Sequence, residues 1–243
     1  MRELAQRAVV ALATVHSVES GEVASLESYA RLGAALGLRP TFEFAGGRVQ
    51  RQALGGGDFV HAAMGEFEAR ALARPGVRVS IDEPYQHYQF AGRADVLAWD
   101  EENLLHIENR TQFPNLQEAA GSYNAKRQYL ASSIARRLDL GPQGWRTVTH
   151  VMACLWSSEV LHVVRLRHAS FAALCPDSPD AFAAWMAGDR PPRPGVTSAF
   201  VLLDPAVMAG SRRRTIASLA DVARVDPRYR GYVDAANALR HTR

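Results

Sequence analysis

Residues 92–110, GRADVLAWDEENLLHIENR, decide the fold that we predict for this 243-residue chain. Two largely apolar arms flank a polar loop at 100–103, which is the pattern of a β-hairpin with a four-residue loop. The register that this loop sets places Asp95 directly opposite Glu108. Opposed residues of a hairpin project from the same sheet face with their Cβ atoms roughly 4.5–5.5 Å apart. The sequence therefore predicts two adjacent carboxylates on one side of a sheet.

Adjacent carboxylates repel each other, so this pair needs a proton, a cation or a metal ion between its members. Carboxylate oxygens suit a hard divalent ion such as Mg²⁺. The same pairing places Arg93 opposite Arg110. The alternative is therefore that these two arginines neutralise Asp95 and Glu108 in a partly buried cluster of salt bridges. The residue pattern alone leaves both possibilities open.

Elsewhere in the chain, the pattern of apolar residues predicts an α+β fold with one mixed sheet. We expect helices at 2–8, 11–20, 25–36, 58–73, 115–138, 168–174 and 180–186, and a last amphipathic helix over 216–225. We expect strands at 77–81, 85–90, 93–99, 104–110, 148–155, 160–165 and 199–203.

Glycines and charge divide the chain into three expected parts. Glycine pairs and triplets at 46–47 and 55–57 indicate a linker, which separates a helical module at 1–45 from an α/β domain at 46–204. The remaining tail, 205–243, holds eight Arg against three Asp. The formal net charge of +3 is therefore concentrated in the tail, and overall charge is a weak argument for nucleic-acid binding.

The composition of the chain excludes several protein classes. No window approaches eighteen uninterrupted apolar residues, so we expect no membrane span, and the first residues lack the apolar core of a secretory signal. Two cysteines, Cys154 and Cys175, are too few for a disulfide framework and lack metal-site spacing. We therefore expect a cytoplasmic protein.

The segment 3–22 resembles the helix-turn-helix of the lambda repressor/Cro-like (XRE) family. The resemblance is carried by Leu4-Ala5, Thr14-Val15 and the closing residues Val18-Glu19-Ser20-Gly21. In that family the second helix lies in the major groove and dimers bind two half-sites. The resemblance implies duplex DNA as partner, a homodimer, and base or backbone contacts from Leu12, Ala13, Thr14, His16 and Ser17.

The helix-turn-helix segment also departs from the family. Val9 stands where the family has a turn glycine, and Ala11 stands where it has a capping serine. The family's first helix would lie before Met1, so we expect a module that lacks it. The alternative is a helical packing module that makes no contact with DNA.

The residues Gly92-Arg93-Ala94-Asp95 and His106-Ile107-Glu108-Asn109-Arg110 resemble the PD-(D/E)XK nuclease-like superfamily. In its active members the Asp and Glu hold a metal ion, and a Lys two residues after the Glu assists the attacking water. Arg110 occupies that position here, and arginine is a poor base because it stays protonated. Lys126, the only lysine, could substitute from the following helix.

A further metal ligand could come from Glu66 or Glu68 on the preceding helix, and the sequence does not choose between them. The resemblance thus implies a restriction-endonuclease-like α/β domain with a candidate Mg²⁺ site at Asp95, Glu108 and Glu66.

The whole layout resembles bacterial XRE-type regulators that carry a nuclease-like domain. We therefore expect a nucleoid-associated transcriptional regulator with a catalytically impaired nuclease-like domain. One alternative is a Mg²⁺-dependent DNA endonuclease that uses Asp95, Glu108, Arg110 and Lys126. Another is a protein-interaction module that does not bind DNA. In the tail, the residues expected to contact phosphates are Arg212, Arg213 and Arg214.

Overall fold

The computed structural model describes residues 1–20, 24–38, 57–87, 90–206 and 215–240. The chain divides into two compact units, Met1–Gln52 and Ala53–Arg243, and each has its own apolar core. The predicted domain boundary at 45–46 and the run Arg212–Arg214 lie outside the described residues.

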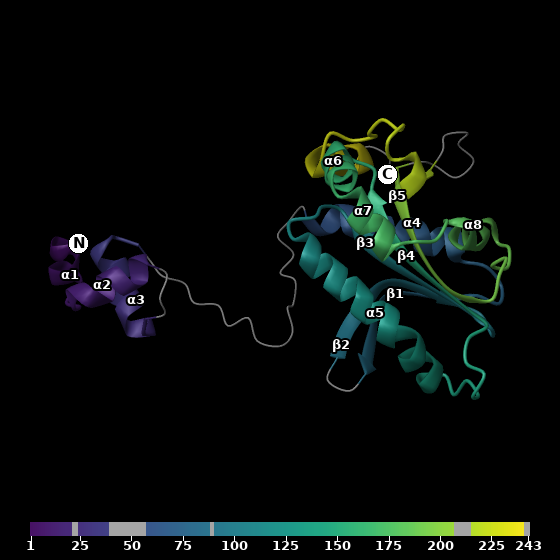
Figure 1. Ribbon diagram of the computed structural model, residues 1–243, viewed down its shortest axis with the longest axis horizontal. Coiled ribbons are helices and arrows are strands. Elements are labelled where there is room, and N and C mark those ends of the chain that lie inside the picture. Colours follow the sequence, from purple (N-terminus) through teal and green to yellow (C-terminus); the bar gives the residue numbers. More distant parts are fainter. Residues whose placement is uncertain (21–23, 39–56, 88–89, 207–214, 241–243) are drawn as a thin grey trace. The chain divides into compact units, whose positions relative to one another are not determined.

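The described part of the first unit consists of three short helices, α1 (Arg2–Ala8), α2 (Leu12–Glu19) and α3 (Leu26–Ala35) (Figure 1). All three lie where the sequence predicts helices. The small core that they share is formed by Ala5, Ala8, Val15, Leu32 and Ala35. Small side chains at these crossings let the helices approach closely.

The turn between α1 and α2 contains Val9 and Ala11, the two residues that depart from the helix-turn-helix pattern. Val9 adopts the left-handed conformation, with φ 54° and ψ 47°, which is where a glycine is favoured. A β-branched residue in this conformation costs about 1–2 kcal/mol. Arg31 of α3 donates a hydrogen bond to the Val9 carbonyl oxygen over 3.0 Å and so supports the turn. Ala11 provides no side-chain cap for α2.

The second unit contains a six-stranded sheet in the order β1-β2-β3-β4-β5-β6. Its strands are β1 (Arg78–His87), β2 (Phe90–Trp99), β3 (Asn103–Arg110), β4 (Thr147–Leu155), β5 (Gly195–Leu203) and β6 (Ile216–Ser218). Pairing is antiparallel from β1 to β3, parallel from β3 to β5, and antiparallel between β5 and β6. The α+β class with a mixed sheet is therefore confirmed.

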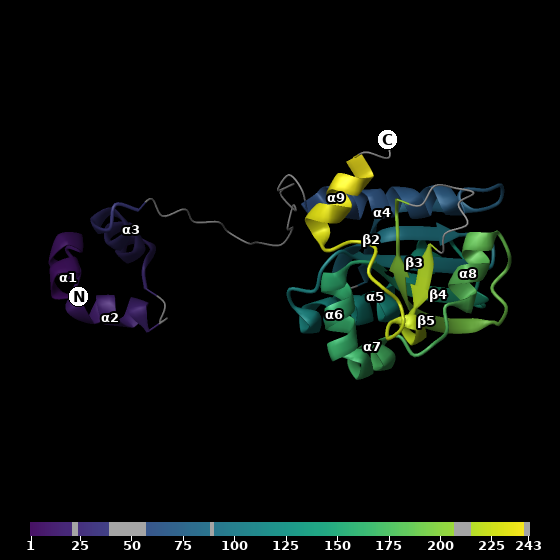
Figure 2. The ribbon, with the colours of Figure 1, turned by 90° about the horizontal axis from the view of Figure 1, so that it is seen from above.

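Helices cover both faces of this sheet, which gives three layers (Figure 2). One face packs against α4 (Gly57–Leu72), α8 (Asp180–Ala187) and α9 (Tyr232–Arg240). The other packs against α5 (Leu116–Arg137), α6 (Ser158–Leu166) and α7 (His168–Leu174). Because both faces are covered, β4 is buried along its whole length and β3 along all but its last residue.

The hairpin register predicted from the sequence is confirmed for the pairs from Val96–Ile107 to Trp99–Leu104. The predicted next pair, Asp95 with Glu108, is not part of the ladder. Pairing of β1 with β2 also skips the same point, where Asp82 takes a left-handed φ of 56°. This local distortion separates β2 from β3 just at the two carboxylates.

One predicted strand, 160–165, is a helix in the structure. Its valines favour a strand locally, but Ser157 caps a helix by accepting a hydrogen bond from Val160 N over 3.3 Å. Burial of Val160, Leu161 and Val164 follows helical spacing, so α6 replaces the strand. The two strands predicted at 77–81 and 85–90 form one strand over Arg78–His87, β1, because pairing with β2 resumes after Asp82. Positions 88–89 lie outside the described residues, and Phe90 begins β2.

The helix predicted over 216–225 is also wrong. Ile216–Ser218 pairs with β5 as β6, and Leu219–Asp221 forms a single 3₁₀ turn closed by a capping box between Ser218 and Asp221. The C-terminal helix is α9, which packs against α4. The described residues from 215 onward are therefore part of the second unit, and the structure does not set them apart as a tail.

Candidate functional site

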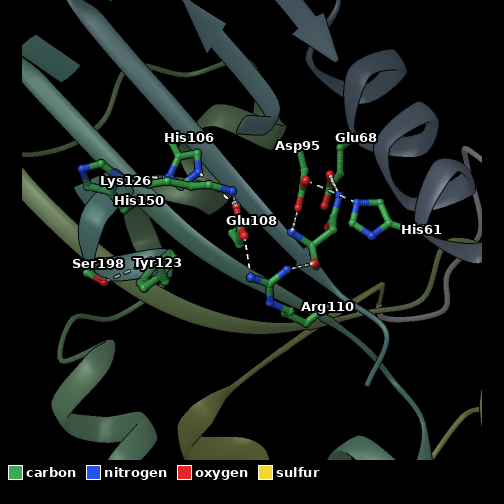
Figure 3. A network of polar contacts seen from close by, with 11 residues as sticks. His61, Glu68, Asp95, His106, Glu108, Arg110, Tyr123, Lys126, His150 and Ser198 are labelled. Atoms are coloured by element: carbon green, nitrogen blue, oxygen red, sulfur yellow. Dashed lines mark hydrogen bonds and ion pairs between the residues drawn. The ribbon is translucent and has the colours of Figure 1, made fainter. Parts of the chain in front are cut away.

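The candidate site lies near the C-terminal end of β3, where side chains from α4, β2, β3 and α5 meet (Figure 3). At its centre is Glu108, whose side chain is 1% exposed. One carboxylate oxygen, Oε1, accepts a hydrogen bond from Arg110 Nη2 over 2.7 Å. The other, Oε2, pairs with Lys126 Nζ of α5. Both oxygens of this buried carboxylate are thus engaged by cations.

Burial disfavours the charged form of Glu108, but this effect is outweighed. The neighbouring His106 and the charges of Lys126 and Arg110 hold the pKa of Glu108 well below its ordinary value. Glu108 is therefore ionised at neutral pH. Its single negative charge is more than offset by the two cations that contact it.

The contact between Glu108 and Lys126 follows from the position of Lys126 on α5. The residues of α5 that are buried, Ala119, Tyr123, Lys126, Leu130 and Ile134, recur every three or four positions. This is the stripe that packs against the sheet, and Lys126 is its charged member. A lone lysine inside an apolar stripe is the sequence signal that places it in the site.

Behind Glu108, two buried histidines extend the polar cluster. His106 Nε2 is 3.6 Å from Glu108 Oε2, and His106 Nδ1 is 3.1 Å from His150 Nδ1. Burial lowers the pKa of both rings, and that of His150 falls well below its ordinary value. Both rings are therefore neutral at neutral pH, and one donates its Nδ1 proton to the other. The residue pattern of the sequence does not predict this pair.

Asp95 lies beside β3 and does not face Glu108. Asp95 Oδ2 accepts a hydrogen bond from the backbone N–H of Asn109 over 2.8 Å, and Asp95 Oδ1 is 3.4 Å from His61 Nε2 of α4. The Asp95 carboxylate thus accepts the hydrogen bond of a β3 amide that lies beyond the last β2–β3 pair. The prediction that both carboxylates project side by side from one sheet face is corrected, because Asp95 contacts α4 and Glu108 contacts α5.

A second carboxyl group, Glu68 of α4, reaches the same end of β3. Glu68 Oε2 accepts a hydrogen bond from Asn109 Nδ2 over 2.9 Å. Burial and the nearby Asp95 charge raise the pKa of Glu68 to about 8, although the bond from Asn109 opposes this shift. Glu68 is therefore mostly protonated at neutral pH.

The structure settles which of the two candidate glutamates reaches the site. Glu68 is fully buried, and Glu66 is exposed. Val60, Met64 and Leu72 are also fully buried, and with Glu68 they recur every four residues along α4. That spacing distinguishes the two glutamates. The prediction that Glu66 lies in the site is corrected, because Glu68 is the one that reaches it.

The predicted neutralisation of the carboxylates by arginines holds for one pair only. Arg110 binds Glu108, but Arg93 Nε pairs with Asp82 Oδ1 over 2.7 Å. Asp95 instead lies next to His61 Nε2 and accepts a hydrogen bond from the Asn109 backbone amide.

In this arrangement the site does not fit a metal ion. Both oxygens of Glu108 are paired with cations, and Glu68 is mostly protonated. Among the residues that the structure describes, no group of three or more His, Cys, Asp or Glu side chains could hold an ion. The arrangement is therefore a closed and nearly charge-balanced cluster.

The residues predicted to contact DNA lie on α2 and are unevenly exposed. Ala13 and His16 are exposed, while Thr14 and Ser17 are half-buried. Leu12 packs against the core of the helical unit, so its side chain is only partly available. Val15 is 1% exposed and anchors the helix to that core.

Comparisons with protein-family models, with curated proteins and with solved structures found no match to this chain. None of the helices in the described residues is long and apolar enough to cross a membrane.

Proposed function

We propose that the chain is a DNA-binding transcriptional regulator whose nuclease-like domain is catalytically impaired. The observation that carries DNA binding is the geometry of α1, the left-handed turn at Val9 and α2. Val15 fixes α2 to the core, so the opposite side of α2, with Ala13 and His16, is open to a partner. A helix that is held on one side and exposed on the other can enter a major groove.

Backbone groups support the same proposal. Because Ala11 gives α2 no side-chain cap, the first amides of this helix are free of a competing side-chain oxygen. Uncapped helix N-termini bind phosphate oxygens. Proteins of this kind bind as twofold dimers, so we expect a homodimer on half-sites about one helical turn apart.

Impairment of the second domain rests on the closed cluster around Glu108. A hard cation would have to displace Lys126 and Arg110 from this carboxylate before binding to it. Breaking a buried ion pair exposes an uncompensated charge, which costs several kcal/mol. The domain is then a scaffold for regulation and does not cleave DNA.

A pair of matched variants tests DNA binding. Ala13 on α2 and Ala30 on α3 are both exposed helical alanines. Ala13→Glu places a negative charge where the phosphates and base edges are expected, and Ala30→Glu places the same charge outside α2. We expect Ala13→Glu to weaken binding of a random-sequence 30-base-pair duplex at least tenfold, as measured by fluorescence anisotropy, with Ala30→Glu close to wild type. Equal affinities for the two variants would refute this proposal.

The second candidate function is a metal-dependent endonuclease, and one observation favours it. The order α4-β1-β2-β3-α5-β4 brings Lys126 onto Glu108, and the backbone amide that Asp95 binds belongs to the next residue, Asn109. Incubation of supercoiled and linear duplex DNA with Mg²⁺ or Mn²⁺ separates the two functions. Cleavage by the wild-type protein that Glu108→Ala abolishes would establish the endonuclease, whereas intact DNA in both samples supports the regulator.

A further inference from the structure

The exposed side of α2 has an unusual composition for a helix that reads DNA. Its described residues, 12–19, include no Arg, Lys, Asn or Gln. Before Glu19 at the end of the helix, the exposed or half-buried side chains that do not pack in the core are those of Ala13, Thr14, His16 and Ser17. All but the histidine are small.

This composition excludes the commonest form of base recognition for α2. Guanine is read by the forked or charged ends of Arg and Lys, and adenine by the two polar atoms of an Asn or Gln amide. His16 offers a single ring nitrogen to any one base edge, and Ser17 has a single hydroxyl group. These two side chains cannot form the bidentate bonds that give most base discrimination.

The same composition favours a different feature of the major groove. The C5-methyl group of thymine projects into that groove and is contacted by Ala and by the methyl group of Thr. Ala13 is exposed at the second position of α2, and Thr14 follows it. Both carry a methyl group close to the backbone, so the helix can approach the base pairs closely.

Electrostatics point the same way. The two charged or titratable side chains of α2 are His16 and Glu19, and Glu19 is exposed at the last position of the helix. An acidic residue there repels phosphates, so the side chains of α2 supply little non-specific attraction. In the same unit, the guanidinium groups of Arg7 and Arg31 donate to the carbonyl oxygens of Ala35 and Val9. Contact with apolar base atoms is therefore the main source of discrimination left to this helix.

We propose that α2 recognises thymine C5-methyl groups in the major groove through the methyl groups of Ala13 and Thr14. This inference rests on the proposed function, since it requires that α2 bind duplex DNA. It adds the chemical feature that the helix reads, which the resemblance to a DNA-binding family does not supply.

The test compares thymine with uracil, which lacks only the C5-methyl group. A duplex library with a random 20-base-pair core is enriched on the full chain at low salt. The enriched pool is then amplified with either thymidine or deoxyuridine triphosphate, and both pools are titrated. Burying one methyl group contributes about 0.8 kcal/mol, which is about fourfold in affinity. With one thymine in each of two half-sites, the uracil pool should bind about fifteenfold more weakly.

Variants then assign the effect to the two side chains. Thr14→Ser removes a methyl group and keeps the hydroxyl group, and Ala13→Gly removes the other methyl group. Loss of helix propensity in Ala13→Gly weakens binding of both pools equally, so the thymine-to-uracil affinity ratio is the measured quantity. We expect each variant to reduce this ratio about threefold to fourfold, with Ser28→Ala on α3 leaving it at the wild-type value.

Each result decides between the two proposals. Enrichment with equal affinity for the thymine and uracil pools overturns the methyl inference and leaves DNA binding standing. A thymine preference that persists in both variants overturns the assignment to Ala13 and Thr14. Failure to retain any duplex at low salt overturns DNA binding and the methyl inference with it.

Discussion

Replacing Glu68 by glutamine tests the buried carboxyl group on α4 and its place in the site. Glu68 is fully buried, and burial together with Asp95 raises its pKa from 4.5 to about 8. Glutamine has the same shape, can accept the bond from Asn109 Nδ2 and stays neutral at every pH. It therefore removes the titration without removing the contact.

The sign and size of the effect follow from linkage between protonation and folding. A carboxyl group whose pKa is raised in the folded state stabilises the fold while it is protonated. That contribution is complete below the unfolded pKa of 4.5 and is lost as the pH rises through about 8. The slope is about 1.4 kcal/mol for each pH unit between these values. From pH 5 to pH 8, wild type should therefore lose about 3.5 kcal/mol of unfolding free energy that Glu68→Gln retains.

Urea denaturation at pH 5, 6, 7 and 8 measures this difference. The four tryptophans, Trp99, Trp145, Trp156 and Trp185, all belong to the second unit, so their fluorescence reports the unit that contains Glu68. Glu66→Gln is the matched control, because it removes an exposed carboxylate from the same helix. Parallel pH profiles for wild type and Glu68→Gln would refute the raised pKa and the burial that causes it.

Two further predictions concern the turn of the helical unit and the Glu108 cluster. Val9→Gly should stabilise α1–α3 by about 1 kcal/mol, because Val9 has φ 54°. Hydrogen exchange over residues 2–19 measures this gain, and Val10→Gly, at a residue without positive φ, should lower protection; equal behaviour of the two variants would contradict the strained turn. Lys126→Met should destabilise the second unit by about 3–5 kcal/mol in urea, since it removes one of the cations on buried Glu108. Adding Glu108→Gln to Lys126→Met should recover a large part of the loss, and a double variant no more stable than the single one would count against the ion pair.

Much of the fold could be predicted because periodicity is local. The loop at 100–103 and the alternation beside it determine the hairpin register, and the structure confirms this register up to Val96–Ile107. The start of the helix predicted at 25–36 is local in the same way, because Ser25 caps it: Ser25 Oγ accepts a hydrogen bond from Ser28 N over 3.1 Å. The error at 160–165 arose because β-branched residues favour strands locally, while burial on one helical stripe determined the outcome.

The site was less predictable because it depends on where strands separate. Asp95 is unpaired in the sheet next to Asp82, and no residue pattern predicts the left-handed conformation of Asp82. Asn109 joins the two halves of the site through its amide and its side chain, yet nothing in the sequence marks it. Lys126 and Glu68 could be found, because each is the polar member of an otherwise apolar helical stripe.

The salt dependence of duplex binding tests the central claim most directly. A DNA-binding protein releases counterions from the phosphates that it contacts, so its affinity falls steeply with salt. For the full chain and a 30-base-pair duplex, we predict measurable binding at 50 mM salt and at least a tenfold loss by 200 mM. Absence of binding at 50 mM salt, or an affinity that does not change with salt, would contradict the claim that this chain is a DNA-binding regulator.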